Sequence, residues 1–360
     1  MKLLGVLLLS LLLAGCASEP LVMRFDPGRV NTSQKLYFPP LDDEEVPRYV
    51  YVGELTGELN FVDKEGTEKN RFVEALKWIA GMFEVQNPLV LQRPQSGVVD
   101  ENGRILVTDV SRSAVFVFDA PNGRLDLWEF AQGFRRFQAP TGIALGPAGR
   151  VFVADADLAQ VYVLDPEGKG TLLIDRDQLS RPTGLAWDAA EGLLYVADTQ
   201  AHQIKVFDAT GRLLRSIGQR GEGPGEFNFP TYLSLAGDRL IVSDTMNARI
   251  QLIPLDGAGA PEILGERGTK LGNLVRPKGV AADSENNIYV IESYYDHLLI
   301  FDRQARFLLP IGGAGKEAGA FYLPAGVWVD RGNRVFVADT FNGRIAVFQF
   351  LGGGVENDSQ

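Results

Sequence analysis

Gly192-Leu-Leu-Tyr-Val-Ala-Asp198, followed by the apolar segment Ile204-Lys-Val-Phe-Asp208, is one copy of a motif that recurs six times in this 360-residue chain. Each copy begins near a proline and contains a short apolar run that ends in an acidic residue. The prolines are Pro94, Pro140, Pro182, Pro230, Pro277 and Pro324, and the acids are Asp109, Asp155, Asp198, Asp244, Glu292 and Asp339. The copies follow one another at intervals of roughly 45 residues, which indicates one structural unit used six times.

Each repeat is composed of β-strands. Its apolar runs are short, rich in Val, Ile, Tyr and Phe, and separated by Gly, Asp, Asn and Pro, as strands and their turns are. Three strands are clear in each copy, and stretches such as Arg212-Leu-Leu-Arg-Ser-Ile217 supply a fourth. Four strands in about 45 residues, repeated, are typical of propeller blades. The sequence therefore predicts an all-β fold, a six-bladed β-propeller of four-stranded blades.

The repeats resemble NHL repeats. The similarity is strongest in Asp244-Thr-Met-Asn-Ala-Arg-Ile250, in Asp339-Thr-Phe-Asn-Gly-Arg-Ile345 and in the linker Gly221-Glu-Gly-Pro-Gly-Glu-Phe-Asn-Phe-Pro230. It extends from Pro94 to Leu351. The first repeat departs from the pattern in the loop after Asp109, and the fifth has Glu292 in place of Asp. The resemblance implies a domain whose commonest role is interaction with other molecules.

The last repeat is one strand short, because only 28 residues remain from Pro324 to Leu351. The segment 48–56 precedes the first repeat and reads as a strand without a hairpin partner. We expect it to be the outer strand of the sixth blade, where it closes the ring and pairs an otherwise open sheet edge. Residues 67–84 have helical apolar spacing and predict one short helix, packed on the propeller or binding a partner or membrane surface. Residues 352–360 read as a disordered tail, and 48–351 as the propeller.

The N-terminus reads as a lipoprotein export signal. Met1-Lys2 precedes an apolar run from Leu3 to Leu13, which is too short to span a bilayer as a helix. Cys16 follows directly on Ala14-Gly15, which resembles the bacterial lipobox; the alternative is an ordinary signal peptide with an incidental cysteine. The resemblance implies that residues 1–15 are removed, that Cys16 is lipidated and that the protein faces the periplasm from the outer membrane. Residues 16–47, polar and rich in proline, read as a tether.

Composition excludes several classes of site. One cysteine rules out an intramolecular disulfide and a multi-cysteine zinc site, and two histidines rule out a three-histidine site. The 35 Lys and Arg against 46 Asp and Glu give a net charge of −11, which disfavours nucleic acid as a partner. No motif calls for a cofactor or a resident metal.

The candidate binding residues lie on one face of the predicted ring. The proline starts and the loops after the six acids share this upper face. It carries Arg93, Arg181 and Arg276 in alternate blades, together with Lys278. Three arginines so placed suit an anionic group; the alternative is that they simply point outward. Tyr294, Tyr295 and Phe341 occupy variable loop positions on the same face and are candidate contact residues.

The six acids have two interpretations. As a ring of carboxylates they suit metal ligands. Alternatively, each accepts backbone N–H groups of its own turn and pairs with a basic residue such as Arg249 or Arg344. Because a residue present in every blade usually serves the blade, the second interpretation is preferred.

Two main functions remain open at this stage. The first is a non-catalytic scaffold, anchored to the membrane through lipid on Cys16, that binds an envelope protein, peptide or glycan; a variant of it is a subunit of an envelope complex. The second is a propeller enzyme, a metal-dependent lactonase, hydrolase or lyase with its site at the axial mouth. Apart from Asp100 and Ser234, the predicted inner strands offer no candidate ligands, and no nucleophile motif is present.

Overall fold

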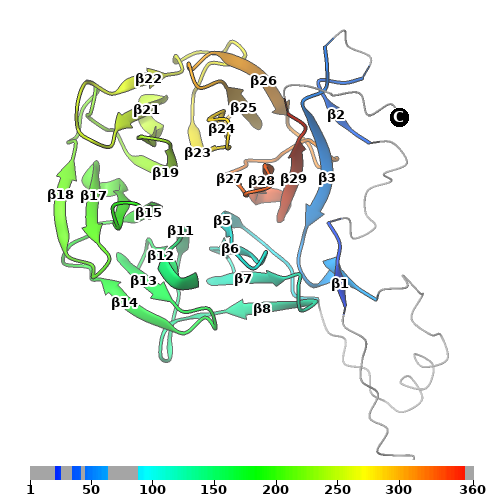
Figure 1. Cartoon of the computed structure of the whole chain (residues 1–360), viewed down its shortest axis with the longest axis horizontal. Helices are drawn as coiled ribbons and strands as arrows, with labels where there is room; N and C mark the ends of the chain where they lie inside the picture. Colours follow the sequence, from blue (N-terminus) through cyan, green and yellow to red (C-terminus); the bar gives the residue numbers. More distant parts are fainter. Residues whose placement is uncertain (1–20, 26–34, 42–44, 64–87, 353–360) are drawn as a thin grey trace, which may run out of the picture.

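Six small antiparallel sheets form a closed ring in the computed structural model of the chain, which describes residues 21–25, 35–41, 45–63 and 88–352 (Figure 1). In five of the sheets the first strand lies nearest the axis and the later strands lie progressively outward; in the sixth, strands from both ends of the chain combine. The predicted all-β, six-bladed propeller is confirmed.

Five blades follow the predicted pattern of four strands in chain order. Blade one contains β5 (Pro94–Val99), β6 (Ile105–Asp109), β7 (Ala114–Asp119) and β8 (Arg124–Trp128); blade two contains β11 (Pro140–Leu145), β12 (Val151–Asp155), β13 (Gln160–Leu164) and β14 (Gly170–Ile174); blade three contains β15 (Pro182–Asp188), β16 (Leu193–Asp198), β17 (Gln203–Asp208) and β18 (Leu213–Ile217); blade four contains β19 (Pro230–Ala236), β20 (Arg239–Asp244), β21 (Arg249–Pro254) and β22 (Glu262–Leu264); blade five contains β23 (Pro277–Ala282), β24 (Ile288–Glu292), β25 (His297–Phe301) and β26 (Phe307–Gly312). A small hairpin of β9 (Phe130–Gln132) and β10 (Arg135–Arg136), which the repeat pattern did not predict, joins blades one and two.

Glycine in the inner strands permits the blades to meet at the axis. A Cβ added at Gly142 would lie 1.9 Å from the carbonyl oxygen of Thr183 in the next blade. One added at Gly326 would lie 2.2 Å from the carbonyl oxygen of Gln95. No side chain fits at such distances, so the repeated glycine is a requirement of the crowded axis.

The hydrophobic core consists of six layers, one between each pair of neighbouring blades. The middle strands β6, β7, β12 and β16 are buried almost throughout, because blades stack on both of their faces. One layer joins blade six to blade one and includes Trp328 and Phe336, stacked at 5.5 Å between ring centroids, together with Phe116. The stacking of blades explains why these strands show no alternation of apolar and polar residues.

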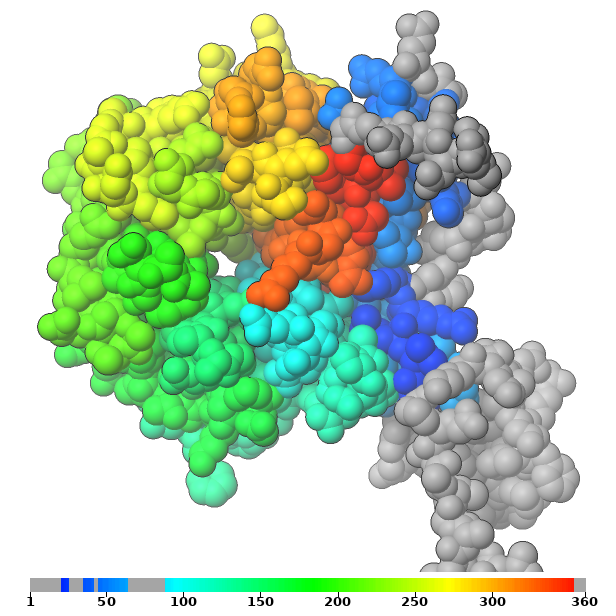
Figure 2. Space-filling view, viewed as in Figure 1, coloured from blue at the N-terminus to red at the C-terminus, as the bar shows by residue number. Residues whose placement is uncertain are grey.

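Ring closure is as predicted. Blade six contains β27 (Val327–Val329), β28 (Arg334–Asp339) and β29 (Arg344–Phe350), and its outer strand is β3 (Tyr49–Leu55) from the other end of the chain. β3 pairs antiparallel with β29 from Ile345↔Leu55 to Phe350↔Tyr49. Figure 2 shows the blue N-terminal atoms against the red C-terminal ones at this blade. The ring is thus closed by backbone hydrogen bonds between segments about 290 residues apart.

Buried polar contacts fasten β3 to the ring. The Nη1 of Arg344 donates to Glu54 Oε2 at 2.7 Å, and its Nε donates to Asp339 Oδ2 at 2.8 Å. Its remaining N–H groups donate to backbone carbonyls of residues 316–320 at 2.9–3.0 Å, so all five donors are used. Burial opposes the charge, but Asp339 and Glu54 raise the pKa of Arg344 above its ordinary value. At the other end of β3, the hydroxyls of Tyr49 and Tyr289 lie 3.1 Å apart.

Part of residues 16–47, which the sequence predicts to be a tether, forms short strands where the structure describes it. Within residues 16–47, β2 (Tyr37–Phe38) pairs with β3 and makes blade six a five-stranded sheet. β1 (Val22–Met23) pairs with β4 (Phe61–Val62) beside it. The physical reason for the pairing of β2 is the edge of β3, whose open backbone groups this short strand covers in part. Sequence periodicity cannot reveal strands of two residues.

Several predicted segments lie outside the described residues: the signal peptide 1–15, Cys16, the helix 67–84 and the tail beyond residue 352. Within the described ranges, no helix has the length and hydrophobicity needed to cross a membrane.

Deleting residues 48–56 tests the closure. The deletion removes β3, exposes the edge of β29 and leaves the buried Arg344 without Glu54, which is strongly destabilising for a buried ion pair. We expect the purified deletion variant to aggregate or to be digested rapidly in limited proteolysis. A soluble variant with an unchanged melting temperature would show that the ring closes in another way.

Candidate functional site

The six acids at the ends of the second strands hold the blade together. The carboxylate of Asp155 accepts the backbone N–H groups of Gln138 and Ala139 at 2.7 and 3.1 Å. Glu292 does the same for Val275 and Arg276 at 2.7 and 3.0 Å, although it is Glu and not Asp. In each blade the carboxylate ties the segment entering the inner strand to the loop after the second strand. The interpretation of these acids as turn and backbone partners is confirmed.

Hydroxyl groups next to these acids join one blade to the next. In blades three, four and six a threonine directly follows the acid, and its hydroxyl donates to the carbonyl of the proline that begins the following blade. These hydrogen bonds are Thr199 to Pro230 at 2.7 Å, Thr245 to Pro277 at 2.9 Å and Thr340 to Pro94 at 2.8 Å. The last of them spans the junction between blade six and blade one, and so contributes to closure.

The loops after the acids and the residues before the prolines do share one face, as predicted. The amide of Met246 donates to the carbonyl of Asn228 at 3.0 Å, and the amide of Phe341 donates to the carbonyl of Tyr322 at 3.1 Å. We call this face the upper face. At its centre is a cavity of about 150 Å³, the axial mouth, lined by Gln95, Thr141, Gly142, Thr183, Thr231, Tyr232 and Lys278.

Tyr232 forms the floor of the axial mouth. It belongs to blade four, and its hydroxyl donates across the axis to the carbonyl oxygen of Gln95 in blade one at 3.2 Å. It also lines the wider channel beneath, a cavity of about 370 Å³ whose lining includes Trp187 and Trp328. Burial raises the pKa of Tyr232, so the hydroxyl stays a protonated donor at neutral pH. The mouth is therefore a shallow cup and not the opening of a wide pore.

Lys278 supplies the charge of the axial mouth. It is half-buried on β23, and no acceptor among the described residues forms a hydrogen bond or ion pair with its Nζ. Burial lowers the pKa of Lys278, and the positive charge of nearby Arg276 lowers it further. The exposed Arg276 guanidinium is likewise without an ion-pair partner in the described part of the chain. Among the described residues, these two cations thus have no acidic partner, although the chain as a whole is acidic.

The three predicted arginines do not share a partner. Arg93 lies over the ring of Phe341, with 5.1 Å from its Cζ to the ring centroid. Arg181 forms an exposed ion pair with Asp157, with 2.9 Å between Nη1 and Oδ1. Arg276 precedes Lys278 by two residues, and its positive charge lowers the pKa of that lysine. Their alternate spacing in the sequence therefore gives three different environments.

Exposed apolar side chains surround the axial mouth over blades four to six. We call this set the aromatic rim: Phe229, Met246, Tyr294, Tyr322 and Phe341, with exposures of 40–56%. The rings of Tyr322 and Phe341 meet edge to face at 5.6 Å, and those of Tyr294 and Tyr295 at 5.0 Å. Aromatic side chains grouped on a surface are typical of contact sites. Predicted residues Tyr294, Tyr295 and Phe341 therefore lie in or beside this rim.

Sequence reasoning missed three residues of this face, Tyr232, Phe229 and Tyr322. A signal existed for Tyr232, because it occupies the position that is glycine in blades such as two and three, at Gly142 and Gly184. Phe229 directly precedes Pro230, and Tyr322 precedes Pro324 by two residues. In the other blades the candidate residues at this place are arginines, which is why the two aromatic residues were not predicted.

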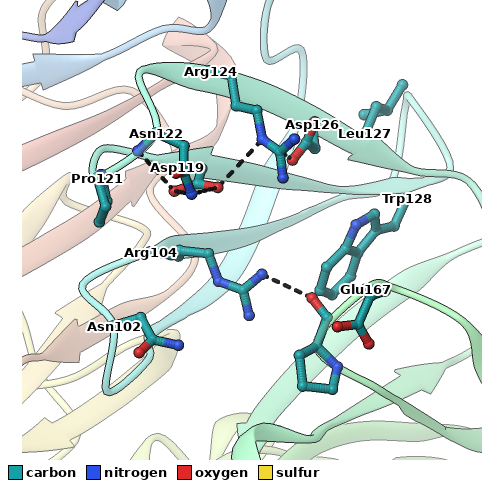
Figure 3. A pocket seen from close by; sticks show the side chains of 11 residues that line it. Asn102, Arg104, Asp119, Pro121, Asn122, Arg124, Asp126, Leu127, Trp128 and Glu167 are labelled. Atoms are coloured by element: carbon teal, nitrogen blue, oxygen red, sulfur yellow. Dashed lines mark hydrogen bonds and ion pairs between the residues drawn. The ribbon is translucent and has the colours of Figure 1, made fainter. Parts of the chain in front are cut away.

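A larger hollow of about 810 Å³ lies on the opposite face, between blades one and two (Figure 3). Arg104 is held there by Asp100, with 2.7 Å from Nε to Oδ2, and by the carbonyl of Pro166 at 2.8 Å. Arg124 is paired with Asp119 and Asp126 at 3.3 and 3.0 Å. These charges compensate one another, whereas Lys278 in the axial mouth has no acidic partner among the described residues, so the mouth is the better site for a charged ligand. Among described side chains, no three His, Cys, Asp or Glu gather in a metal-binding group.

Comparison with known proteins supports the fold and the repeat type. A family model described as a 6-bladed beta-propeller matches residues 187–257. A peptidylglycine alpha-amidating monooxygenase from Rattus norvegicus is 29% identical over 164 residues, covering 41% of this chain and 16% of the relative. Human NHL repeat-containing protein 3 is 27% identical over 208 residues, covering 53% of this chain and 56% of the relative. The chain thus matches less than two thirds of the length of these curated relatives.

Solved structures with the same fold include binding proteins and enzymes. An auxiliary nutrient binding protein from Bacteroides thetaiotaomicron superposes with a TM-score of 0.57 at 14% identity, covering 72% of this chain and 69% of that chain. A catalytically inactive virginiamycin B lyase from Staphylococcus aureus, crystallised with quinupristin, gives 0.53 at 12% identity, with 72% and 95% covered. At these identities the likeness concerns the fold alone.

Replacing Thr340 by Val tests the hydroxyl links between blades. The variant keeps the shape of the side chain but loses the hydrogen bond to the Pro94 carbonyl, so we expect the free energy of unfolding to fall by about 1 kcal/mol. Urea unfolding measures this change. The matched control is Thr171→Val, because Thr171 is exposed on β14. Equal stability of the two variants would contradict the structural role of the Thr340 hydroxyl.

Proposed function

Starting from a six-bladed propeller built from NHL-type repeats, we propose that the protein is a non-catalytic binding scaffold anchored to the cell envelope. It presents its upper face to an envelope protein, peptide or glycan. The observation that carries this proposal is the combination, on one face, of the exposed aromatic rim with Lys278 and Arg276, two cations that have no acidic partner in the described part of the chain. Aromatic residues and arginine are the side chains that most often dominate binding energy at interfaces.

Similar proteins support a binding role by their described functions. Nutrient-binding proteins of Bacteroides share the fold, and so does a chain from a nidogen/laminin complex, with a TM-score of 0.51 at 18% identity. In an acidic chain of net charge −11, a cationic, aromatic face is a local exception. Such a face favours an anionic or mixed partner over a cationic one.

The anchoring part of the proposal rests on sequence. Cys16 follows an apolar run and Ala14-Gly15, as in bacterial lipoproteins. Several acyl chains on one cysteine hold a protein firmly at a membrane, whereas one chain holds it marginally. With Ala17 after the cysteine, we propose the outer membrane, with the propeller facing the periplasm.

A propeller lyase or hydrolase is the second candidate, favoured by the fold shared with virginiamycin B lyase. Of the two polar residues singled out near the ends of the inner strands, Asp100 is engaged: its carboxylate pairs with Arg104 at 2.7 Å and accepts the Asn102 and Arg104 amides at 3.0 and 2.8 Å. This engagement makes Asp100 a structural residue and favours the scaffold over the enzyme. Stoichiometric calcium or zinc in the purified protein would favour the enzyme.

Replacing Cys16 by Ala tests the anchor. We expect the variant to lose lipid labelling and to move from the membrane pellet to the soluble fraction. Ser18→Ala, two residues away, is the matched control and should stay in the pellet. Membrane retention and labelling of the Cys16 variant equal to those of the control would contradict lipid anchoring at this residue.

A photo-crosslinking amino acid placed at Phe341 or Tyr294 tests the binding face in cells. We expect discrete crosslinked products at both positions, because both side chains are about half exposed on the aromatic rim. Leu214 is the matched control, with 45% exposure on the outer strand β18 of blade three. Crosslinking at Leu214 alone, or equal crosslinking at all three positions, would contradict binding at the upper face.

A further inference from the structure

The axial mouth holds a positive charge that nothing in the described part of the chain neutralises. Lys278 Nζ is without a carboxylate or carbonyl partner there, and it lines the cavity itself, two residues after another cation, Arg276. A partly desolvated ammonium without an acceptor costs free energy. An anion that enters the mouth would remove this cost, and its attraction to both cations would offset the repulsion between them. The charge therefore indicates an anionic ligand group.

The other polar groups of the mouth are already committed, and this limits the kind of anion. The Thr183 hydroxyl lies 2.7 Å from the carbonyl oxygen of Thr231, to which it donates, and the hydroxyls of Thr231 and Thr245 lie 2.6 Å apart. Tyr232 donates to the Gln95 carbonyl. A phosphate needs donors for three oxygens, whereas a carboxylate presents two. Lys278, with its three N–H donors, can satisfy the two oxygens of a carboxylate, and Arg276 lies outside the mouth as a further donor.

The size and walls of the mouth suit a short apolar stem. Its volume of about 150 Å³ is too small for a sugar ring with its hydration, and the Tyr232 ring and Gly142 form apolar parts of its lining. From these observations we infer that the axial mouth is a carboxylate-binding site, in which Lys278 pairs with the carboxylate and Tyr232 contacts a short aliphatic stem. The inference rests on the proposed binding function and names the chemical group that the upper face recognises.

Two sources can present this group, a small carboxylic acid and the free C-terminus of a peptide. Both place a carboxylate at the end of a short stem. The Arg276 guanidinium and the aromatic rim outside the mouth provide further contacts only for a ligand that continues beyond it, such as a peptide.

Isothermal titration calorimetry on the full chain in detergent tests the site, with propionate, butyrate and hexanoate as probes. We expect butyrate to bind and butyramide, its neutral counterpart, to bind at least tenfold more weakly. This comparison needs no variant. Lys278→Met should weaken butyrate binding at least tenfold, while Lys169→Met, an exposed lysine in the loop between β13 and β14, should leave it unchanged. Thermal unfolding of both variants verifies that they are folded.

A tetra-alanine peptide with a free C-terminus, and the same peptide amidated, distinguish the sources. Tighter binding of the free peptide than of butyrate, lost on amidation, assigns the site to peptide ends; binding of butyrate alone assigns it to small acids. Equal binding of butyrate and butyramide, or unchanged butyrate affinity in Lys278→Met, would overturn the inference, as would tighter binding of inorganic phosphate. If crosslinks at Phe341 persist while carboxylates fail to bind, the scaffold function stands and this inference alone falls.

Discussion

Closure of the ring by the pairing of β3 with β29 is the constraint on which the rest of the structure depends. The chain has one cysteine, so no intramolecular disulfide can hold the two ends of the propeller together. Backbone hydrogen bonds do so, reinforced by the buried contacts of Arg344 with Glu54 and Asp339. The upper face exists only because six blades converge, since the axial mouth takes lining residues from five of them.

Much of this architecture is predictable from the sequence, because repetition multiplies weak local signals. The acids and prolines recur since each blade needs the same turn and the same start, and the glycines recur since most blades need a slim residue at the axis. Closure by segment 48–56 is predictable because the last repeat lacks a strand. The short strands β1 and β2 are not, because two residues carry no periodicity; β2 makes part of the expected tether an extension of blade six, and β1 forms a separate small sheet with β4.

The candidate site is predictable only in part. Repeat position places Arg93, Arg181 and Arg276 on one face, but their partners depend on the individual loops: Phe341 for the first, Asp157 for the second and proximity to Lys278 for the third. Whether a hydroxyl or a charge is free to bind depends on contacts between blades. The functional signal is thus a departure from the repeat, such as Lys278 or Tyr232, and the repeated residues themselves serve the scaffold.

Hydrogen–deuterium exchange on the full chain tests closure most directly. The account predicts that amides of β3, Tyr49–Leu55, are protected to the same degree as those of β17 in the middle of blade three, and that they exchange together with β29 in one cooperative opening. Rapid exchange of β3 while β17 stays protected would show that the segment is a loosely attached edge, and would contradict a ring closed by its two ends.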